Sequence, residues 1–483
     1  MQKTMVDIKS RPPSPEIAGI RNAINFINMR PGGNNTSLCI GINENPAERK
    51  RINDELMALY PGSIEQVGFV DLTPGSYRLQ MAFNEFCGNA TRSAAYVALD
   101  GQQGEIEIVV SDGTKDGVRL KAGVAEDGEA FAQMPIYAEP DRVEEDLALP
   151  GNSTVRMKGI THYVNWDTNI IKDKTDEEIK AIGLQIIKER QLISKSSPAA
   201  GVIFAERTEN GIKITPVVRV GEIDSEDGTT FLETACGSGT MAVAMSEAKK
   251  TGVSIKDLSI IQPSGMPIRA TVNYTGTEFT YAEIKGPLDF LNTGTLVETG
   301  SGPCVVEQIS SKEMIMAALN EGGLKSLYRD SFNVPPYEED FPDDEIEGAF
   351  LQYMGKGTLF LARSQEKVVG FGAALPLPED AKVAEIASRF GFDMETTQYM
   401  ADLGVDEDWR KNDIAKILAL SRISTFPKGT TVLMRTSENN IYSKGLYAGL
   451  GFKEVPNMIQ KVERKRIGGK TSVDTRIFMS KVI

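Results

Sequence analysis

The sequence predicts an α+β protein in which a pseudo-duplicated front domain is followed by a second, α/β domain. Residues 15–300 read as short strand-like segments interrupted by small-residue helices, two of which begin at a Cys-Gly-polar triplet. After residue 311 the pattern changes to amphipathic helices that alternate with apolar strands. We therefore expect one domain over residues 1–300, whose two halves each fold a sheet around a central helix, and another over residues 312–483.

The composition is typical of a soluble globular protein and bears on function only through the partners that its charge disfavours. The chain has 483 residues, of which 41% are hydrophobic and 25% charged, enough for two or three domains. A formal net charge of −14 argues against nucleic acid and anionic membranes as partners. The sequence shows neither a long apolar run nor the apolar core of a signal peptide. We expect a cytoplasmic protein without a membrane or nucleic-acid partner, and a homodimer stays open.

Four cysteines and one histidine limit the chemistry. Cys39, Cys87, Cys236 and Cys304 have no CxxC spacing, so neither a disulfide framework nor a zinc site is expected. The single histidine, His162, excludes a His-rich metal centre, and no G-x-S-x-G segment supports a Ser-His-Asp triad. We expect no metal.

Two of the cysteines stand where helices begin, at Cys87-Gly88-Asn89 and at Cys236-Gly237-Ser238. A helix N-terminus presents free N–H groups and partial positive charge, which bind anions and lower the pKa of a thiol. Two such starts that face each other would hold a carboxylate and place its α-carbon between two sulfurs. One thiolate then removes the α-proton while the other thiol protonates the opposite face, which inverts the centre. The alternative for each cysteine is a buried small hydrophobe.

These segments resemble the motifs of diaminopimelate epimerase and its relatives, the cofactor-independent amino-acid racemases. The first segment, Glu85–Arg92, reads EFCGNATR, and the second, Glu233–Gly239, reads ETACGSG. The resemblance covers about residues 15–300. It implies the fold, Cys87 and Cys236 as the catalytic pair, and a reaction that needs no pyridoxal phosphate.

The resemblance also implies a set of substrate-binding residues around the two thiols. They are Asn34, Gly88, Asn89, His162, Glu222, Gly237 and Ser238. A packed strand histidine is an equal alternative for His162, and a solvated carboxylate is an alternative for Glu222. Ile160, Ala200 and Ile223 stand where the family holds the far end of diaminopimelate, so we expect another amino acid. Histidine is among the candidates, because histidine racemases belong to this branch.

The region from about residue 320 to 465 resembles the GNAT-type acetyltransferases. The stretch Arg410–Ala415, RKNDIA, stands where the family has the loop that binds the pyrophosphate of coenzyme A. The implied acetyl-coenzyme A residues are Arg410, Ala415, Asn440 and Tyr447. Tyr447 would be the general acid, with a tyrosine packed on the sheet as the alternative. Asp413 replaces the usual loop glycine and opposes phosphate, so binding of acetyl-coenzyme A stays open.

Three functions remain after these observations. The first is a cofactor-independent amino-acid racemase or epimerase that uses two cysteines and carries a GNAT-like domain. The second is an N-acetyltransferase for an amino acid or amine, whose front domain only binds substrate. The third is a non-catalytic scaffold or sensor. Retention of both Cys87 and Cys236 favours the first, because a binding module needs no thiol on each face of its ligand.

Overall fold

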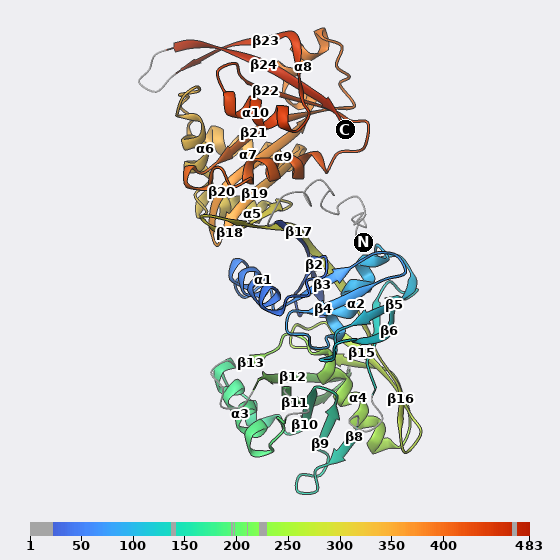
Figure 1. The fold of residues 1–483 in the computed structure, drawn as a ribbon. Helices are drawn as coiled ribbons and strands as arrows, with labels where there is room; N and C mark the ends of the chain where they lie inside the picture. The colour runs from blue at the N-terminus through green and yellow to red at the C-terminus, as the bar shows by residue number, and fades with distance from the viewer. Residues whose placement is uncertain are drawn as a thin grey trace. The chain divides into compact units, whose positions relative to one another are not determined.

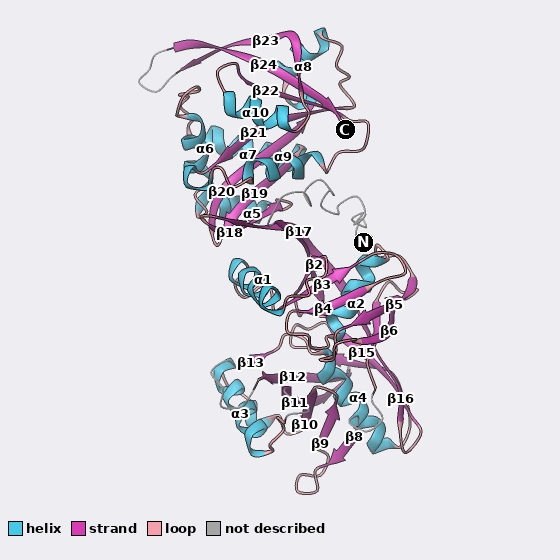
Figure 2. Cartoon of the chain, viewed as in Figure 1, coloured by secondary structure: helices cyan, strands magenta, loops and turns pink. Residues whose placement is uncertain are grey.

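The structure is a computed structural model that divides the chain into two compact units, Ile27–Leu291 and Asn292–Ile483, the latter together with residues 23–26. The residues it describes are 23–136, 142–194, 197, 199–209, 211–221, 229–465 and 471–483. Figure 1 labels the helices and strands along the chain, and Figure 2 colours them by type.

The front unit runs through the same series of elements twice. The first pass consists of β1 (Ala23–Pro31), β2 (Thr36–Ile40), α1 (Pro46–Leu59), β3 (Gln66–Asp71), β4 (Arg78–Met81), α2 (Gly88–Ala98), β5 (Gly104–Val110), β6 (Val118–Val124) and β7 (Ala130–Gln133). The second pass consists of β8 (Arg142–Glu145), β9 (Ser153–Met157), β10 (Ile160–Asn165), α3 (Asp176–Glu189), β11 (Ala199–Thr208), β12 (Gly211–Val220), β13 (Thr229–Leu232), α4 (Gly237–Thr251), β14 (Ile255–Ile261), β15 (Pro267–Tyr274) and β16 (Phe279–Gly286).

Strand pairing repeats together with the order of the elements. β2 is parallel to β3 and β10 is parallel to β11, and α1 and α3 make these two crossovers. In the same way β4 is parallel to β5 and β12 to β14, with α2 and α4 between them. A parallel pair requires such a crossover, so each half is folded around its central helix. The antiparallel pair β7 and β16 joins the halves, which confirms the predicted pseudo-duplication.

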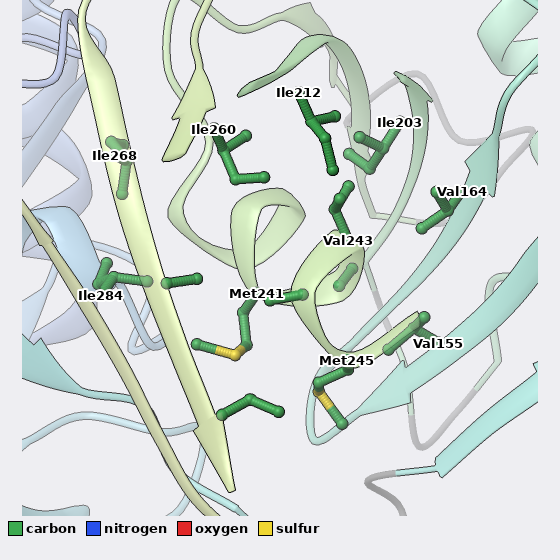
Figure 3. Close-up of a cluster of buried hydrophobic side chains, with 14 of the residues drawn as sticks. Val155, Val164, Ile203, Ile212, Met241, Val243, Met245, Ile260, Ile268 and Ile284 are labelled. Atoms are coloured by element: carbon green, nitrogen blue, oxygen red, sulfur yellow. The ribbon is translucent and has the colours of Figure 1, made fainter. Parts of the chain in front are cut away.

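The helices follow from local sequence and from burial. α1 begins after Asn45, whose side chain accepts two backbone N–H groups, and α3 begins with a capping box between Thr175 and Glu178. α2 and α4 are instead rich in small apolar residues, because they are buried on nearly all sides. Figure 3 shows Met241, Val243 and Met245 of α4 inside a core of strand side chains. Burial of each such side chain contributes about 1.5–3 kcal/mol.

The second unit is one mixed sheet with helices on both faces. Its elements are β17 (Leu288–Thr299), β18 (Gly302–Gln308), α5 (Lys312–Asn320), α6 (Leu324–Phe332), α7 (Asp343–Lys356), β19 (Thr358–Ser364), β20 (Lys367–Pro376), α8 (Ala381–Arg389), β21 (Thr397–Val405), α9 (Ile414–Ile423), β22 (Thr431–Ser437), α10 (Ile441–Gly449), β23 (Lys453–Lys465) and β24 (Thr471–Val482). Successive side chains along the strands point to opposite faces of the sheet. Those on one face pack against α5, α6, α7 and α8, and those on the other pack against α9 and α10.

Within this sheet β21 and β22 are parallel, and the other pairs that the structure describes are antiparallel. β18 pairs with β19, so we propose that the second domain starts at Gly302 or earlier, ahead of residue 312. None of the helices in the described ranges is both long and apolar enough to cross a membrane.

Candidate active site

Both predicted helix starts are present, and each has a cysteine at its N-cap. Cys87 has an extended backbone (φ −135°, ψ 110°), and its Sγ accepts the N–H of Ala90 at 3.3 Å. Cys236 has nearly the same conformation (φ −123°, ψ 106°), and its Sγ accepts the N–H of Gly239 at 3.1 Å. Both sulfurs therefore lie at the positive ends of their helices.

The two helix starts meet at one side chain. A Cβ added at Gly88 would lie 2.8 Å from Cδ1 of Ile284, and one at Gly237 would lie 3.1 Å from the same atom. The position at Gly237 is also 3.6 Å from Oδ1 of Asn89. The fold thus brings both motifs together, and the absence of side chains at the two glycines leaves their backbones close to this contact.

The thiol of Cys87 has an amide as its second partner. Its Sγ donates to Oε1 of Gln66 at 3.2 Å. The amide nitrogen of Gln66 donates to Oδ1 of Asn34 at 2.6 Å and to Oγ1 of Thr36 at 2.7 Å. These two bonds fix which end of the amide faces the sulfur. Because an amide oxygen only accepts, this partner stabilises the protonated thiol.

Cys236 has a different set of partners. Its Sγ lies 3.5 Å from Oγ of Ser238, and that hydroxyl lies 2.9 Å from Nε2 of His162. His162 is fully buried, and burial lowers its pKa to about 3, so the ring is neutral. The backbone N–H of Cys236 donates to Oε1 of Gln262 at 2.9 Å. His162 therefore reaches Cys236 through Ser238.

The sequence analysis did not single out two carboxylates: Glu233, which acts on both thiols, and Glu65, which acts on Glu233. Burial raises the pKa of Glu233 to about 7, and its charge acts on both Cys87 and Cys236. The negative charge of Glu65 raises the pKa of Glu233 further. The carboxylate of Glu65 accepts hydrogen bonds from Asn34 at 3.0 Å and from Thr234 at 2.5 Å. The only sequence signal for Glu233 is its place within the second motif, and Glu65 has none.

Burial opposes ionisation of the thiols. It raises the pKa of Cys87 to about 11 and the pKa of Cys236 well above its ordinary value. The negative charge of Glu233 raises the pKa of Cys236 further. The expected lowering of the thiol pKa is therefore wrong for the substrate-free protein, because desolvation outweighs the hydrogen bond from each helix start. A cation held beside the sulfurs would favour the thiolate.

The arginine of the first motif holds its neighbour in place. Arg92 is fully buried, and its Nε donates to Oδ1 of Asn89 at 3.2 Å. Its Nη1 donates to the carbonyl oxygen of Gly286 at 2.9 Å. Arg92 thus connects the start of α2 to the end of β16, in the other half of the front unit.

Other predicted positions have separate outcomes. Glu222 and Ile223 lie outside the described residues. Asn34 is nearly buried and is bonded to Glu65 and Gln66, so it orders the groups beside Cys87. Within the described ranges no cluster of His, Cys, Asp and Glu is arranged to hold a metal ion.

The predicted pyrophosphate loop leads into α9 in the second unit. Arg410 is exposed and donates to the carbonyl oxygen of Val405 at 3.1 Å, and Ala415 lies in the first turn of α9. Asp413 has a left-handed backbone (φ 58°), and its exposed side chain makes no capping bond. The N–H of Gly300 donates to Oδ1 of the neighbouring Asn412 at 3.2 Å.

These residues do not fit a pyrophosphate. The carboxylate of Asp413 would stand at the helix start where a phosphate needs positive charge. The loop is also bonded to the turn between β17 and β18, through Gly300 and through the Ser301 hydroxyl, which donates to the carbonyl oxygen of Asp408 at 2.6 Å. We therefore assign no acetyl transfer to this domain.

The two remaining predicted cofactor residues are engaged within the protein. Asn440 is the N-cap of α10, where it accepts from Ser443 at 3.0 Å and donates to Tyr337 at 3.1 Å. Tyr447 is buried, and its hydroxyl accepts from Nη2 of Arg422 at 3.1 Å.

Comparison with known proteins divides the chain in a similar way. Residues 23–297, more than half of the chain, match the model of the histidine racemase CntK N-terminal domain, and residues 323–452 match the acetyltransferase (GNAT) family. A histidine racemase of Staphylococcus aureus is 27% identical over 256 residues, which cover 51% of this chain and 87% of that protein. One from Fusobacterium nucleatum is 26% identical over 255 residues, which cover 50% of this chain and 87% of that protein.

Solved structures with related folds match each part. A hydroxyproline epimerase from Agrobacterium vitis with bound trans-4-hydroxy-L-proline has a TM-score of 0.40 at 13% identity, covering 57% of this chain and 92% of that chain. A ribosomal-protein-alanine N-acetyltransferase from Brucella melitensis has a TM-score of 0.27 at 15% identity, covering 36% of this chain and 99% of that chain.

Proposed function

Because the chain belongs to the family of the histidine racemase CntK N-terminal domain, we propose that it interconverts L- and D-histidine with two cysteines. Its front domain is an isomerase, an amino-acid racemase or epimerase that works without pyridoxal phosphate. The observation that supports the two-cysteine mechanism is the meeting of two helix starts at the same Ile284 side chain, each with a cysteine, Cys87 or Cys236, at its N-cap.

The groups around the thiols suit the two charges on an amino acid. The free N–H groups at the starts of α2 and α4 would bind the substrate carboxylate, with the side chains of Asn89 and Ser238 beside them. Glu233 and Glu65 would attract the ammonium group, since one acts electrostatically on both thiols and the other lies beside it. This arrangement would place the α-carbon between the sulfurs.

Binding of the ammonium group would prepare the proton transfer. The positive charge of the ammonium group would offset the negative charges of Glu233 and Glu65. The pKa values of the two thiols would fall as a result. The thiolate formed on one cysteine takes the α-proton, and the thiol of the other gives its proton to the opposite face of the α-carbon. The net result is inversion with one proton gained and one lost, so neither a metal nor a cofactor is needed.

Histidine as the substrate is supported by the curated relatives, which are histidine racemases, and by the polar surroundings of Cys87. Glu65 and Gln66 have oxygens that can accept an imidazole N–H, and both are bonded to Asn34. Asn34 would then be a residue that orients these acceptors, in place of a direct substrate ligand.

The test is α-proton exchange. The reduced protein would be incubated in heavy water with L-histidine and separately with D-histidine, and deuterium and chirality would be followed by mass and chiral chromatography. We expect deuterium at the α-carbon of the inverted product. Cys87→Ala and Cys236→Ala should each lower racemisation by at least about 10³-fold, since each removes one of two essential groups. Cys39→Ala is the matched control, because Cys39 is a buried cysteine elsewhere in the front unit. Near-full racemisation by either active-site variant would rule out the two-base mechanism.

A further inference from the structure

The turn between β14 and β15 holds the chain that leads into the second cysteine motif. Two backbone bonds close this turn: Gln262 donates to the carbonyl oxygen of Met266 at 3.0 Å, and Gly265 donates to that of Gln262 at 2.9 Å. From the same turn, the N–H of Ser264 donates to the carbonyl oxygen of Thr234 at 3.1 Å. The turn is therefore a fixed support beside the start of α4.

One side chain of this turn is buried against the helix start. Gln262 is fully buried, and its Oε1 accepts the backbone N–H of Cys236 at 2.9 Å. Its Nε2 donates to the carbonyl oxygen of Ile260 and to Oγ1 of Thr240, both at 3.0 Å. A backbone N–H only donates and a carbonyl oxygen only accepts, so the bonds to Cys236 and Ile260 fix the orientation of the amide.

The amide of Gln262 acts on the backbone of Cys236 at two points. The hydroxyl of Thr240 donates to the carbonyl oxygen of Cys236 at 2.7 Å. Because this hydroxyl also accepts from Gln262, its single proton is directed to the carbonyl oxygen. Gln262 therefore holds Cys236 directly at its N–H and through Thr240 at its carbonyl oxygen.

These bonds complete the N-terminal cap of α4. In a capping box the N-cap side chain accepts the N–H of the third helical residue, whose own side chain accepts the N–H of the N-cap. Cys236 makes the first of these bonds with Gly239 at 3.1 Å, but a glycine has no side chain for the second. Gln262 supplies the missing acceptor from another element of the fold.

The first half of the front unit has a different residue at the corresponding place. Ser111 follows β5 as Gln262 follows β14. The hydroxyl of Ser111 donates to the carbonyl oxygen of Glu85 at 2.7 Å, two residues before Cys87. The amide that holds the N-cap N–H is therefore a feature of Cys236, and Cys87 provides an internal reference.

We propose that Gln262 is a positioning residue for proton transfer at Cys236 and has no such role at Cys87. This inference rests on the proposed racemisation by two cysteines. Proton transfer requires a short and defined distance between the sulfur and the α-carbon, and a displacement of about 1 Å can cost about 100-fold in rate. Gln262 holds the backbone that carries the sulfur, so it acts on the reaction through the place of that atom.

The test uses the full chain with Gln262→Met, which keeps the length of the side chain and removes both hydrogen-bonding groups. We expect kcat for histidine racemisation to fall by about 10- to 100-fold and KM to change by less than about threefold, because the substrate keeps its own contacts. Ser153→Ala is the matched control. It breaks another buried bond to α4, between the hydroxyls of Ser153 and Ser246 at 2.7 Å, and leaves the bonds of Cys236 in place.

The isotope effect of the substrate assigns the loss to one thiol. Rates would be compared for α-deuterated and unlabelled histidine, separately for the L and D forms. In Gln262→Met we expect the effect to rise for the enantiomer whose α-proton Cys236 removes, because that step then limits the rate. For the other enantiomer Cys236 acts second, so the effect should fall. Thr91→Val removes the bond from Thr91 to the carbonyl oxygen of Cys87 at 2.7 Å and should shift the two effects in the opposite sense.

The outcomes separate this inference from the proposed function. No racemisation of histidine by the unchanged protein would overturn the proposed function, and this inference with it. Racemisation by the unchanged protein, with the same isotope effects in Gln262→Met, would overturn this inference alone. A lower melting temperature in that case would assign Gln262 a purely structural role. If Gln262→Met does not fold, Thr240→Val must give the opposite shifts for the two enantiomers, and Thr240→Ser, which keeps the hydroxyl, must restore the original values.

Discussion

Nε2 of His162 lies 2.9 Å from the hydroxyl oxygen of Ser238, which in turn lies 3.5 Å from Sγ of Cys236. Nδ1 of His162 is buried and has no hydrogen-bond partner among the described residues. A neutral ring has one proton, and a buried N–H without an acceptor is rare in proteins. We therefore expect the proton on Nε2, where Ser238 accepts it. The hydroxyl proton of Ser238 is then free to donate to the Cys236 sulfur.

The tautomer can be observed directly, because His162 is the single histidine of the chain. In protein labelled with ¹⁵N-histidine, the imidazole spectrum contains one ring. We expect the shifts of a neutral Nε2–H ring that do not change between pH 7 and pH 5, since burial lowers the pKa of His162 to about 3. A ring protonated at Nδ1, or one that titrates in this range, would contradict the arrangement.

The rate of racemisation should depend on whether the side chain at position 162 donates a hydrogen bond to Ser238. Gln places an N–H near the position of Nε2, so His162→Gln should keep racemisation within about tenfold of the unchanged protein. His162→Leu and Ser238→Ala remove a bond from the chain of bonds that reaches a charged sulfur, a loss of about 1.5–3 kcal/mol, or about 10- to 150-fold in kcat. The measurement is the initial rate of D-histidine formation. Equal rates for the Gln and Leu variants would show that the donor is irrelevant.

Burial of His162 predicts a loss of stability in acid. The folded pKa, about 3, lies below the ordinary value of 6.5, so between these values the unfolded chain binds the extra proton. Stability therefore rises with pH through this window and falls on acidification. From pH 7 to pH 5 the contribution is about 2 kcal/mol. We expect unfolding of the front domain to be less acid-sensitive in His162→Gln by this amount, as measured by urea denaturation at both pH values. The same pH dependence in both proteins would contradict the neutral buried ring.

The sequence predicted the parts of the fold that depend on local signals. The two cysteine motifs mark the starts of α2 and α4. It did not identify β24, because nothing local shows that Thr471–Val482 pairs with β22 and β23. Pairing between distant strands is decided by the whole sheet.

The site was predictable only where chemistry lies within a motif. Cys87 and Cys236 stand in recognisable segments, whereas Gln66 and Glu65 reach the site from β3 and the loop before it. The thiol pKa shows the same limit. A helix start predicts a lower value from sequence, but the amount of burial that raises it is a property of the assembled core.

The contact between the two helix starts predicts that a side chain at Gly88 displaces its neighbours. A Cβ there would lie 2.8 Å from both Cδ1 of Ile284 and Sδ of Met134. Because both atoms are the far ends of flexible side chains that can shift, Gly88→Ala should destabilise the front domain by only about 1 kcal/mol and lower kcat, as Ile284 moves at the point where the helix starts meet. Gly348→Ala is the control, since its Cβ meets nothing within 4 Å on α7.

A second change tests the cause of the Gly88 effect. Ile284→Val removes Cδ1, the atom that the new methyl group meets, so the double variant should recover part of both stability and kcat. Urea unfolding and the rate of histidine racemisation give the two readouts. If the effects of the two changes simply add, the contact at Ile284 does not explain the effect of a side chain at Gly88.

The bond between Arg422 and Tyr447 predicts a structural cost in the second domain. Both side chains are buried, and Nη2 of Arg422 donates to the tyrosine hydroxyl at 3.1 Å. Tyr447→Phe leaves that N–H without an acceptor and should lower stability by about 1–3 kcal/mol. Histidine racemisation should be unchanged, because Cys87 and Cys236 lie in the front unit. Tyr442→Phe, at a side chain that is 84% exposed, should have no effect on melting. Unchanged melting of Tyr447→Phe would mean that the hydroxyl contributes nothing to stability, and it would restore Tyr447 as a candidate proton donor to a bound ligand.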